Sequence, residues 1–245
     1  MNVKSAALSV LAASLVSSAA GAAPTVFFGE NLTPGGGVSG APVTARNSFL
    51  LSLNSFGTET FEGFPNVTGA PLELVFPGAA GGVTGTLTSG DAFVYDTVPN
   101  DRYNTTAGGK NYLEVSAATF TITFSRAISA FGFYGTDIGD FNGQLTLHLD
   151  GAGGGVDLTV PHTVDSPDGA LLFYGFIDST AQYTSITFGN TTPFTEVFGF
   201  DDMIVGDPVA SGAVPEPGTL ALTGIALAGL LRARKRKGSF GGQRS

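Results

Sequence analysis

The sequence predicts an all-β fold, an antiparallel β-sandwich or jelly roll, for the part of the chain between its two ends. Charged residues make up only 13% of the 245 residues, while glycine occurs 36 times, a composition typical of strands joined by tight turns. Apolar and polar residues alternate in several segments, so that Phe120, Ile122 and Phe124 share one face of a strand. Such segments recur about every 8 to 15 residues with Gly, Asn and Asp between them, as expected for antiparallel strands.

Residues 1–22 have the layout of a secretory signal peptide. Lys4 comes first, an apolar stretch follows at residues 6–20, and Ala-Gly-Ala at residues 20–22 forms a cleavage site with small residues. The alternative, an amphipathic N-terminal helix, would need a charged face that this stretch lacks. We therefore expect export of the chain and a mature protein that begins near Ala23.

The body of the chain is expected to be one domain. Residues 23–57 show no steady alternation and are expected to be a loosely structured lead-in, residues 58–207 to form the β-sandwich domain, and residues 208–214 to be a linker. The expected strands are residues 58–62, 72–76, 83–88, 91–95, 112–115, 119–124, 128–135, 144–150, 156–160, 171–177, 183–189 and 197–205.

Charge and cysteine content exclude several classes of function. Only four Lys or Arg residues lie between the signal peptide and the C-terminal segment, against 19 of the 20 Asp and Glu residues. Nucleic acid is therefore not expected as a partner, because phosphate binding needs clustered cations. Divalent cations, neutral sugars or a basic surface fit this balance better. The chain has no cysteine, which excludes disulfides and thiolate catalysis.

The C-terminal segment contains a short candidate membrane span. Residues 218–231 are predominantly apolar, and as a helix they would extend about 21 Å, less than the roughly 30 Å of a hydrocarbon core. A basic cluster follows at once, and its long side chains can snorkel and hold that end on the cytoplasmic side. The cluster consists of Arg232, Arg234, Lys235, Arg236 and Lys237. We expect a single transmembrane helix here, with the body outside the cytoplasmic membrane.

The motif that precedes this helix carries a family resemblance. Pro215, Glu216 and Pro217, then the short apolar helix, then the basic cluster near the chain end, resemble the PEP-CTERM sorting signal of Gram-negative bacteria, here at residues 215–237. The resemblance implies processing by exosortase near the Pro-Glu-Pro and release to the cell surface or its polysaccharide matrix. The tail at residues 238–245 is longer than is common.

The prolines suit that role physically, because they hold the backbone extended before the helix and present it to a protease. The alternative is a permanent anchor, in which case the protein stays in the inner membrane.

The body also carries resemblances. Its later strands are similar to jelly-roll ectodomains found ahead of PEP-CTERM signals. The Phe-Glu-Gly-Phe at residues 61–64 and the Phe-Asp-Asp-Met-Ile-Val at residues 200–205 more distantly resemble carbohydrate-binding modules of the jelly-roll type. In those modules a first-strand Glu and a last-strand Asp hold a structural calcium ion, which would nominate Glu62 and one of Asp201 or Asp202 here.

Two candidate metal sites follow. Asp201 and Asp202 are adjacent on an expected strand, so they should point to opposite faces, and the buried one needs either a cation near Glu62 or hydrogen bonds from turn amides. A weaker candidate is the loop with Asp137, Asp140 and Asn142, whose alternative is a solvated turn.

Catalytic motifs are absent from the sequence, so the protein is not expected to be an enzyme. His148 and His162 lie near neither a Gly-x-Ser-x-Gly nor a His-Glu-x-x-His motif, although a glycosidase carboxylate pair could be assembled by the fold alone.

The leading expectation is a non-enzymatic protein of the cell surface or exopolysaccharide matrix that binds carbohydrate through exposed tyrosines. The candidate tyrosines are Tyr95, Tyr103, Tyr112, Tyr134 and Tyr174. One alternative is a secreted hydrolase that acts on polysaccharide. Another is ice binding, suggested by two threonine rows at Thr84, Thr86, Thr88 and at Thr119, Thr121, Thr123.

Overall fold

The computed structural model describes residues 23–35, 37–79, 81–96, 102–116, 119–192 and 196–209. The expected signal peptide, the sorting signal with its membrane helix, and the tail lie outside these residues. Within them, no helix has the length and apolar character needed to cross a membrane. A compact unit ends at Pro208, and the fold is that of this unit.

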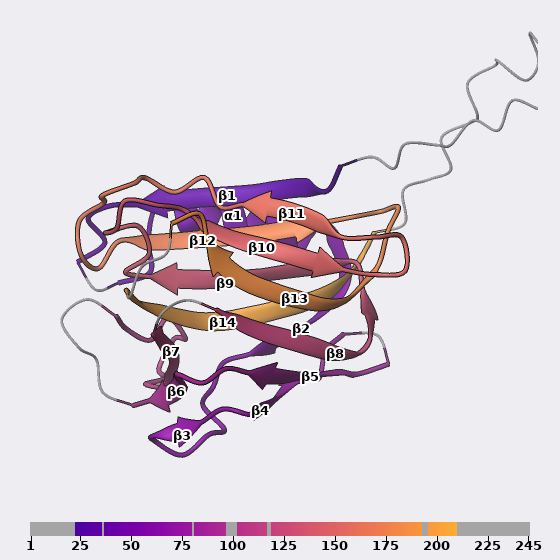
Figure 1. Cartoon of the computed structure of the whole chain (residues 1–245), viewed down its shortest axis with the longest axis horizontal. Coiled ribbons are helices and arrows are strands. Elements are labelled where there is room, and N and C mark those ends of the chain that lie inside the picture. Colours follow the sequence, from indigo (N-terminus) through magenta and orange to yellow (C-terminus); the bar gives the residue numbers. More distant parts are fainter. Residues whose placement is uncertain are drawn as a thin grey trace, which may run out of the picture. The chain divides into compact units, whose positions relative to one another are not determined.

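The unit consists of two antiparallel sheets (Figure 1). Sheet A contains, in spatial order, β1 (Thr25–Asn31), β12 (Leu171–Ile177), β9 (Ala130–Thr136), β14 (Val197–Pro208), β7 (Tyr112–Ser116), β6 (Ala92–Tyr95) and β3 (Thr68–Gly69), with β2 (Leu53–Glu59) also paired to β14. Sheet B contains β11 (Val156–Thr159), β10 (Leu145–Asp150), β13 (Tyr183–Asn190), β8 (Phe120–Ile128), β5 (Val83–Thr88) and β4 (Leu72–Phe76). The predicted all-β class is confirmed.

The main core lies between the two sheets and is rich in phenylalanine. Phe120 and Phe188 of sheet B stack with ring centroids 4.1 Å apart, and Phe200 of sheet A meets Phe120 edge to face at 5.2 Å. Phe133 of sheet A approaches Phe188 at 5.4 Å. These contacts across the gap identify a β-sandwich, because the inward side chains of both sheets interdigitate.

The prediction of a loose lead-in at residues 23–57 is wrong. The segment forms β1, the helix α1 (Ala41–Leu51) and the start of β2. The helix begins with a proline in its first turn, at Pro42, which suits that position because its missing N–H has no partner there. Sequence periodicity missed this helix because only Pro42 and Phe49 are fully buried along it.

Phe49 holds α1 on the outer side of sheet A. Its side chain is fully buried and packs against Phe27 and Phe173, with ring centroids 5.5 and 5.7 Å away. The ring lies over Gly132 of β9 and Gly175 of β12, which are direct partners in the sheet. A β-carbon at either glycine would approach the ring to 3.2 or 3.0 Å, so the pair of glycines makes the room for Phe49. A second, smaller core forms here.

Phe49→Ala should therefore destabilise the unit by about 3 to 5 kcal/mol, because a large buried aromatic leaves a cavity. The free energy of unfolding from chemical denaturation measures this loss. Leu51→Ala, at a position on the same helix that is 83% exposed, should change it by about 0.5 kcal/mol or less. Equal losses in the two variants would contradict this account of α1.

Candidate functional site

A β-bulge in β14 turns Asp201 and Asp202 to the same side of sheet A. The pairing of β14 with β9 shifts register at these residues, and Asp202 has a φ of 46°, which is rare outside glycine. The residues of β14 that face the main core are Phe198 and Phe200 before the bulge and Met203 and Val205 after it. The inward positions thus change from even to odd numbers, and both aspartates lie on the outer side. The expectation of opposite faces is wrong.

The loop before β7 supplies the hydrogen-bond donors for Asp201, which is 1% exposed. Its Oδ2 accepts from the backbone N–H groups of Thr105 and Thr106 at 2.6 and 3.1 Å and from the Thr105 hydroxyl at 3.0 Å. Its Oδ1 accepts from the N–H of Asp202 at 2.7 Å. Burial and the neighbouring Asp202 carboxylate nevertheless raise the pKa of Asp201 to about 8. The sequence left two alternatives for the buried aspartate, a cation or hydrogen bonds from turn amides. The structure shows the hydrogen bonds.

Asn104 joins Glu62 to Asp201. Its Nδ2 lies 3.0 Å from Glu62 Oε1, 3.2 Å from Asp201 Oδ2 and 2.7 Å from the carbonyl oxygen of Asn111. Glu62 Oε1 also accepts from the N–H groups of Lys110 and Asn111 at 2.7 and 2.8 Å. A calcium ion prefers six to eight oxygen ligands and would have to replace the amide group of Asn104 where these oxygens converge. Calcium binding by Glu62 with Asp201 or Asp202 stays a prediction.

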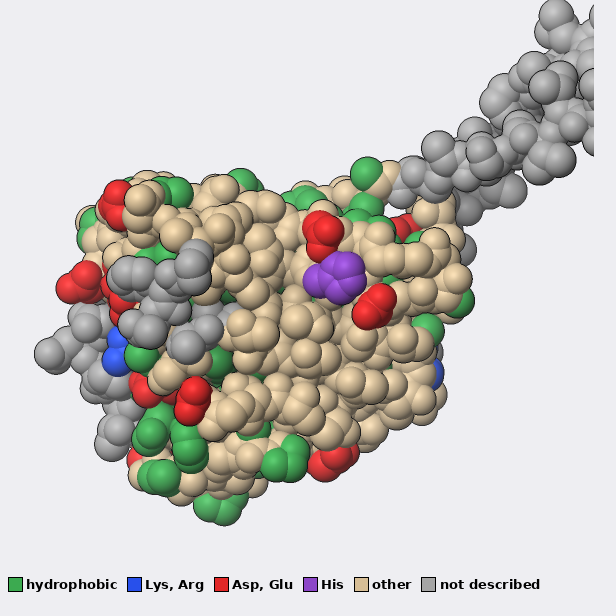
Figure 2. Space-filling view, in the orientation of Figure 1, with side chains coloured by type: hydrophobic (Ala, Val, Ile, Leu, Met, Phe, Trp, Pro, Cys, Tyr) green, Lys and Arg blue, Asp and Glu red, His purple; other side chains and the backbone are tan. Residues whose placement is uncertain are grey.

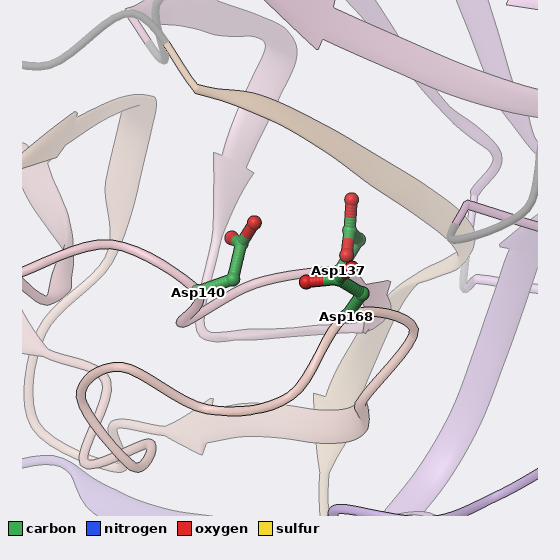
Figure 3. A group of neighbouring side chains, drawn as sticks. All are labelled: Asp137, Asp140 and Asp168. Carbon is green, nitrogen blue, oxygen red and sulfur yellow. The ribbon is translucent and has the colours of Figure 1, made fainter.

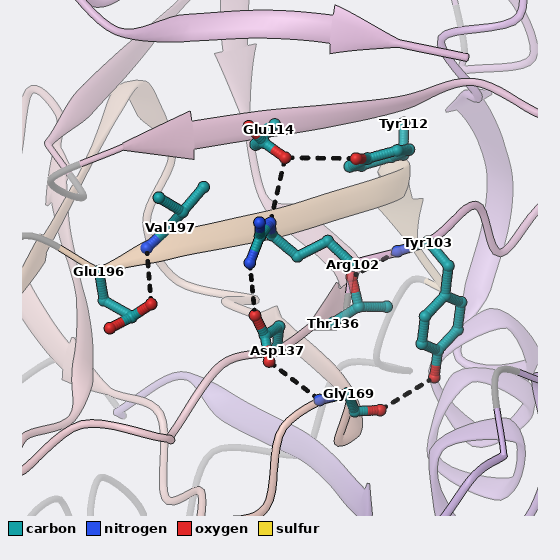
Figure 4. Close-up of polar contacts among 9 residues, drawn as sticks. All are labelled: Arg102, Tyr103, Tyr112, Glu114, Thr136, Asp137, Gly169, Glu196 and Val197. Atoms are coloured by element: carbon teal, nitrogen blue, oxygen red, sulfur yellow. Dashed lines mark hydrogen bonds and ion pairs between the residues drawn. The ribbon is translucent and has the colours of Figure 1, made fainter. Parts of the chain in front are cut away.

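Arg102 fixes this loop to the sandwich (Figure 4). Its Nε donates to Glu114 of β7 at 3.0 Å, and its Nη1 donates to Asp137, just after β9, at 2.7 Å. The other oxygen of Asp137 accepts from the N–H of Gly169 at 2.9 Å. One guanidinium group thus ties the loop to two strands of sheet A and, through Asp137, to the segment before β12.

A second group of carboxylates surrounds Asp137. One oxygen each from Asp137, Asp140 and Asp168 lies within 4.8 Å of the others (Figure 3). Oδ1 of Asp140 is buried and has no hydrogen-bond partner, and burial, followed by the charges of Asp137 and Glu196, raises the pKa of Asp140 to about 6. Asn142 is exposed, and its carbonyl oxygen accepts from the Thr192 hydroxyl.

The sequence did not predict Asp168 as a member of this group, because it lies on a different loop from Asp137 and Asp140. A buried carboxylate oxygen without a donor fits a cation, which would satisfy it.

The two histidines have structural partners. His162 is buried, its Nε2 accepts from the N–H of Leu145 at 3.0 Å, and its Nδ1 lies 3.1 Å from the carbonyl oxygen of Thr163, so the proton sits on Nδ1. Burial lowers the pKa of His162. His148 is exposed and lies 2.6 Å from Asp157, and this hydrogen bond raises its pKa. Within the described residues neither ring is hydrogen-bonded to a hydroxyl or amine nucleophile.

The expected tyrosine platforms are largely absent from the surface of the described unit. Tyr103, Tyr112, Tyr134 and Tyr174 are all buried, and only Tyr95 is partly exposed. The interpretation of these four as sugar platforms is wrong, because they pack beneath loops and between the sheets.

The threonine rows do meet on the outer face of sheet B. Thr86 and Thr88 of β5 pair with Thr123 and Thr121 of β8, and Thr121 pairs in turn with Thr187 of β13. Figure 2 shows a broad area over these strands with few hydrophobic or basic side chains. Sheets twist by about 20 to 25° per strand, so a regular hydroxyl spacing extends over only a few strands. Ice binding stays a prediction.

Comparison with known families finds the PEP-CTERM protein-sorting motif at residues 213–237. The resemblance of the C-terminal segment is thereby confirmed: the chain carries this sorting motif. No curated protein sequence matches the chain.

Solved structures similar to this chain include an adhesin domain and a carbohydrate-binding module. The K2 cleaved adhesin domain of Lys-gingipain is 14% identical, with 61% of this chain and 97% of that chain covered and a TM-score of 0.39. The C-terminal family 22 carbohydrate-binding module of Clostridium thermocellum Xyn10B is 15% identical, with 66% and 98% covered and a TM-score of 0.36. TM-scores this low carry no argument about function, and the β-sandwich assignment rests on the strand pairing described above.

Replacing Arg102 should be far more costly than replacing Arg126, which forms a partly exposed ion pair with Asp207 at 3.4 Å. Arg102→Gln leaves Asp137, which is 2% exposed, without its cation, and we expect a loss of about 3 kcal/mol in the free energy of unfolding. Arg126→Gln should cost less than about 1 kcal/mol. Denaturant titration of both variants at pH 7 measures the difference, and similar losses would show that Arg102 does not anchor the loop.

Proposed function

We propose that this chain is an exported, non-enzymatic protein of the cell surface or exopolysaccharide matrix, sorted and cleaved through its C-terminal signal and able to bind carbohydrate. The observation that carries the proposal is the sorting motif at residues 213–237. In this scheme residues 1–22 are the signal peptide, residues 218–231 form the transmembrane helix of an inner-membrane precursor, and exosortase cuts near the Pro-Glu-Pro.

The features of the body support display outside the cell. The β-sandwich is held by two apolar cores and by hydrogen bonds and ion pairs such as those of Arg102, with no need of a disulfide. A domain with these properties can be released from its anchor without losing its fold, because the compact unit ends at Pro208, before the motif begins.

The partners of His162 favour a binding protein over a hydrolase. Both ring nitrogens of His162 are engaged by backbone groups, so this ring is not free to act as a general base. A panel of glycoside and ester substrates tests the alternative, and turnover by the purified protein would establish a hydrolase.

The sorting step has a direct test. Mass spectrometry of the protein from the producing cells should find a mature C-terminus near residues 215–218, because cleavage there removes the apolar helix and the basic cluster. The combined change Pro215→Ala, Glu216→Ala and Pro217→Ala should leave the C-terminal cluster attached and retain the protein in the membrane fraction.

The matched control for sorting is Gln243→Ala, in the tail beyond the motif, which should leave processing unchanged. A surface-exposed wild-type protein that still carries Arg232 to Lys237 would instead establish a permanent anchor.

The proposed protein also holds a structural calcium ion at Asp140 and Asp168, beside Asp137. The support is the buried Asp140 oxygen without a donor and the proximity of three carboxylates. Asp137 is already engaged by Arg102 and Gly169, so Asp140 and Asp168 would be the main protein ligands. The ion would join the loop after β9 to the loop before β12, in parallel with the Arg102 contacts.

Calcium should raise the thermal stability of the purified protein relative to EDTA. At a calcium concentration about 100-fold above the Kd, the gain in free energy of unfolding is about 2.7 kcal/mol. Asp140→Asn and Asp168→Asn should each abolish the shift, whereas Asp165→Asn, the same charge change at an exposed position of the same loop as Asp168, should keep it. A wild-type protein with equal melting temperatures in calcium and EDTA would remove the proposed site.

A further inference from the structure

A cavity of about 450 Å³ opens on the outer side of sheet A. Its volume falls within the roughly 300 to 1,000 Å³ typical of small-ligand sites. Helix α1 and the segment before it form one wall, the loop before β7 forms another, and β9 and β14 form the floor. The lining residues are Val38, Val43, Arg46, Thr105, Thr106, Ala107, Tyr134 and Asp202.

Arg46 differs from the other cations of the described residues. Arg102, Lys110 and Arg126 each form an ion pair with a carboxylate, whereas Arg46 has no such pair within the part of the chain that the structure describes. Its Nε is buried and has no hydrogen-bond acceptor. The charge of Arg46 acts on the Asp202 carboxylate in the same cavity, but without an ion pair its guanidinium group is available for an anion from outside the chain.

The guanidinium group of Arg46 is held in place by Tyr134. It lies 5.9 Å from the centre of that ring, a cation–π contact. The Tyr134 ring is itself fixed edge to face against Phe173 at 5.4 Å. Since the guanidinium is pre-positioned, binding an anion costs less side-chain entropy than it would with a free surface arginine.

The other part of the cavity is lined by a hydrogen-bond acceptor, in contrast to the donor groups of Arg46. The bulge presents Asp202, whose Oδ1 accepts from the Thr106 hydroxyl at 2.8 Å and whose Oδ2 lies 3.5 Å from the Thr105 hydroxyl. Its oxygens accept these hydrogen bonds, so they favour a ligand with hydroxyl donors. The backbone strain at Asp202, with its positive φ, is typical of functional positions.

The remaining lining is apolar. Val38, Val43 and Ala107 can cover carbon–hydrogen surface but offer no side-chain hydrogen bonds. A ligand complementary to the whole cavity therefore carries an anionic group that pairs with Arg46 and hydroxyl groups that bind Asp202 and the threonines. It also carries an apolar ring face that packs on the valines and Ala107.

We infer that the cavity binds a sugar acid, a hydroxylated ring that bears a carboxylate, with the carboxylate on Arg46 and ring hydroxyls on Asp202. The inference rests on the carbohydrate-binding part of the proposed function and gives it a site and a ligand class. The ligand is either a free sugar acid or a uronate unit of a polysaccharide. The acidic body gives a polyanion no general electrostatic attraction, so binding has to come from this site.

The test is isothermal titration calorimetry of the purified protein with galacturonic acid, polygalacturonate and the neutral polymer dextran. Wild-type protein should bind an acidic ligand and not dextran. Binding of the monomer identifies the free sugar acid as sufficient, and binding of polygalacturonate alone identifies the polymer as the source. Equal binding of dextran, or no binding of either acidic ligand, would overturn the inference.

Three variants make the test specific. Arg46→Gln should weaken binding about 10-fold or more, since it removes a charge-assisted pair. Val43→Phe should also weaken it by filling the cavity without a change of charge. Lys110→Gln removes the same charge as Arg46→Gln from a side chain that is 67% exposed and outside the cavity, and it should bind within about 2-fold of wild type.

Melting temperatures show whether the variants are folded. Loss of binding in folded Lys110→Gln, or wild-type affinity in folded Arg46→Gln, would overturn the inference. Because these readouts do not involve the C-terminus, failure here leaves the sorting part of the proposed function untouched, and failure of sorting leaves the cavity untouched.

Discussion

The architecture at one end of the sandwich depends on the burial of the Asp201 carboxylate in the middle of sheet A. A buried carboxylate without donors is strongly unfavourable, and the strand that carries Asp201 has its own backbone groups committed to β7 and β9. The donors come instead from residues 104–106, so this loop must lie across the sheet. Arg102 holds it there through Glu114 and Asp137. The bulge, the loop and the arginine are therefore one arrangement, and each needs the other two.

This arrangement also determines which surfaces are free. The outer side of sheet A carries the loop and helix α1, whose Phe49 fills the room left by Gly132 and Gly175. A cavity lies between the two, and Asp202, which is only 8% exposed, lines it because the bulge has turned this residue outward. The outer side of sheet B carries short hydroxyl side chains in its threonine rows.

The sequence was a good guide wherever a strand has one buried and one solvated face. Residues 72–76 and 83–88 alternate cleanly and form β4 and β5 with the predicted bounds. It was a poor guide where contacts between residues far apart in the sequence determine the local structure. Helix α1 is fixed by Phe49, which packs on glycines of two strands that lie far from the helix in the sequence. The bulge at Asp202 reverses the face of the sheet to which strict alternation would assign this residue. Asp168 joins Asp137 and Asp140 only because two loops meet. Tyr103 and Tyr134 are buried in the smaller core beside α1 and Tyr174 in the main core, which no local pattern reveals.

Most of the cations of this chain lie in its C-terminal segment. Six of the 11 Lys and Arg residues lie at or after Arg232, so cleavage near the Pro-Glu-Pro would leave a mature body with very few cations. Three of the four that remain in the described unit are committed to carboxylates of the chain. The unit has few cations and many carboxylates, so each arginine has several carboxylates near which it could lie. We therefore expect every arginine to form an ion pair. Arg46 instead lies against Tyr134, and its buried Nε has no hydrogen-bond acceptor within the described residues. The unsatisfied nitrogen costs stability, and an anionic ligand in the cavity would recover that cost each time it binds.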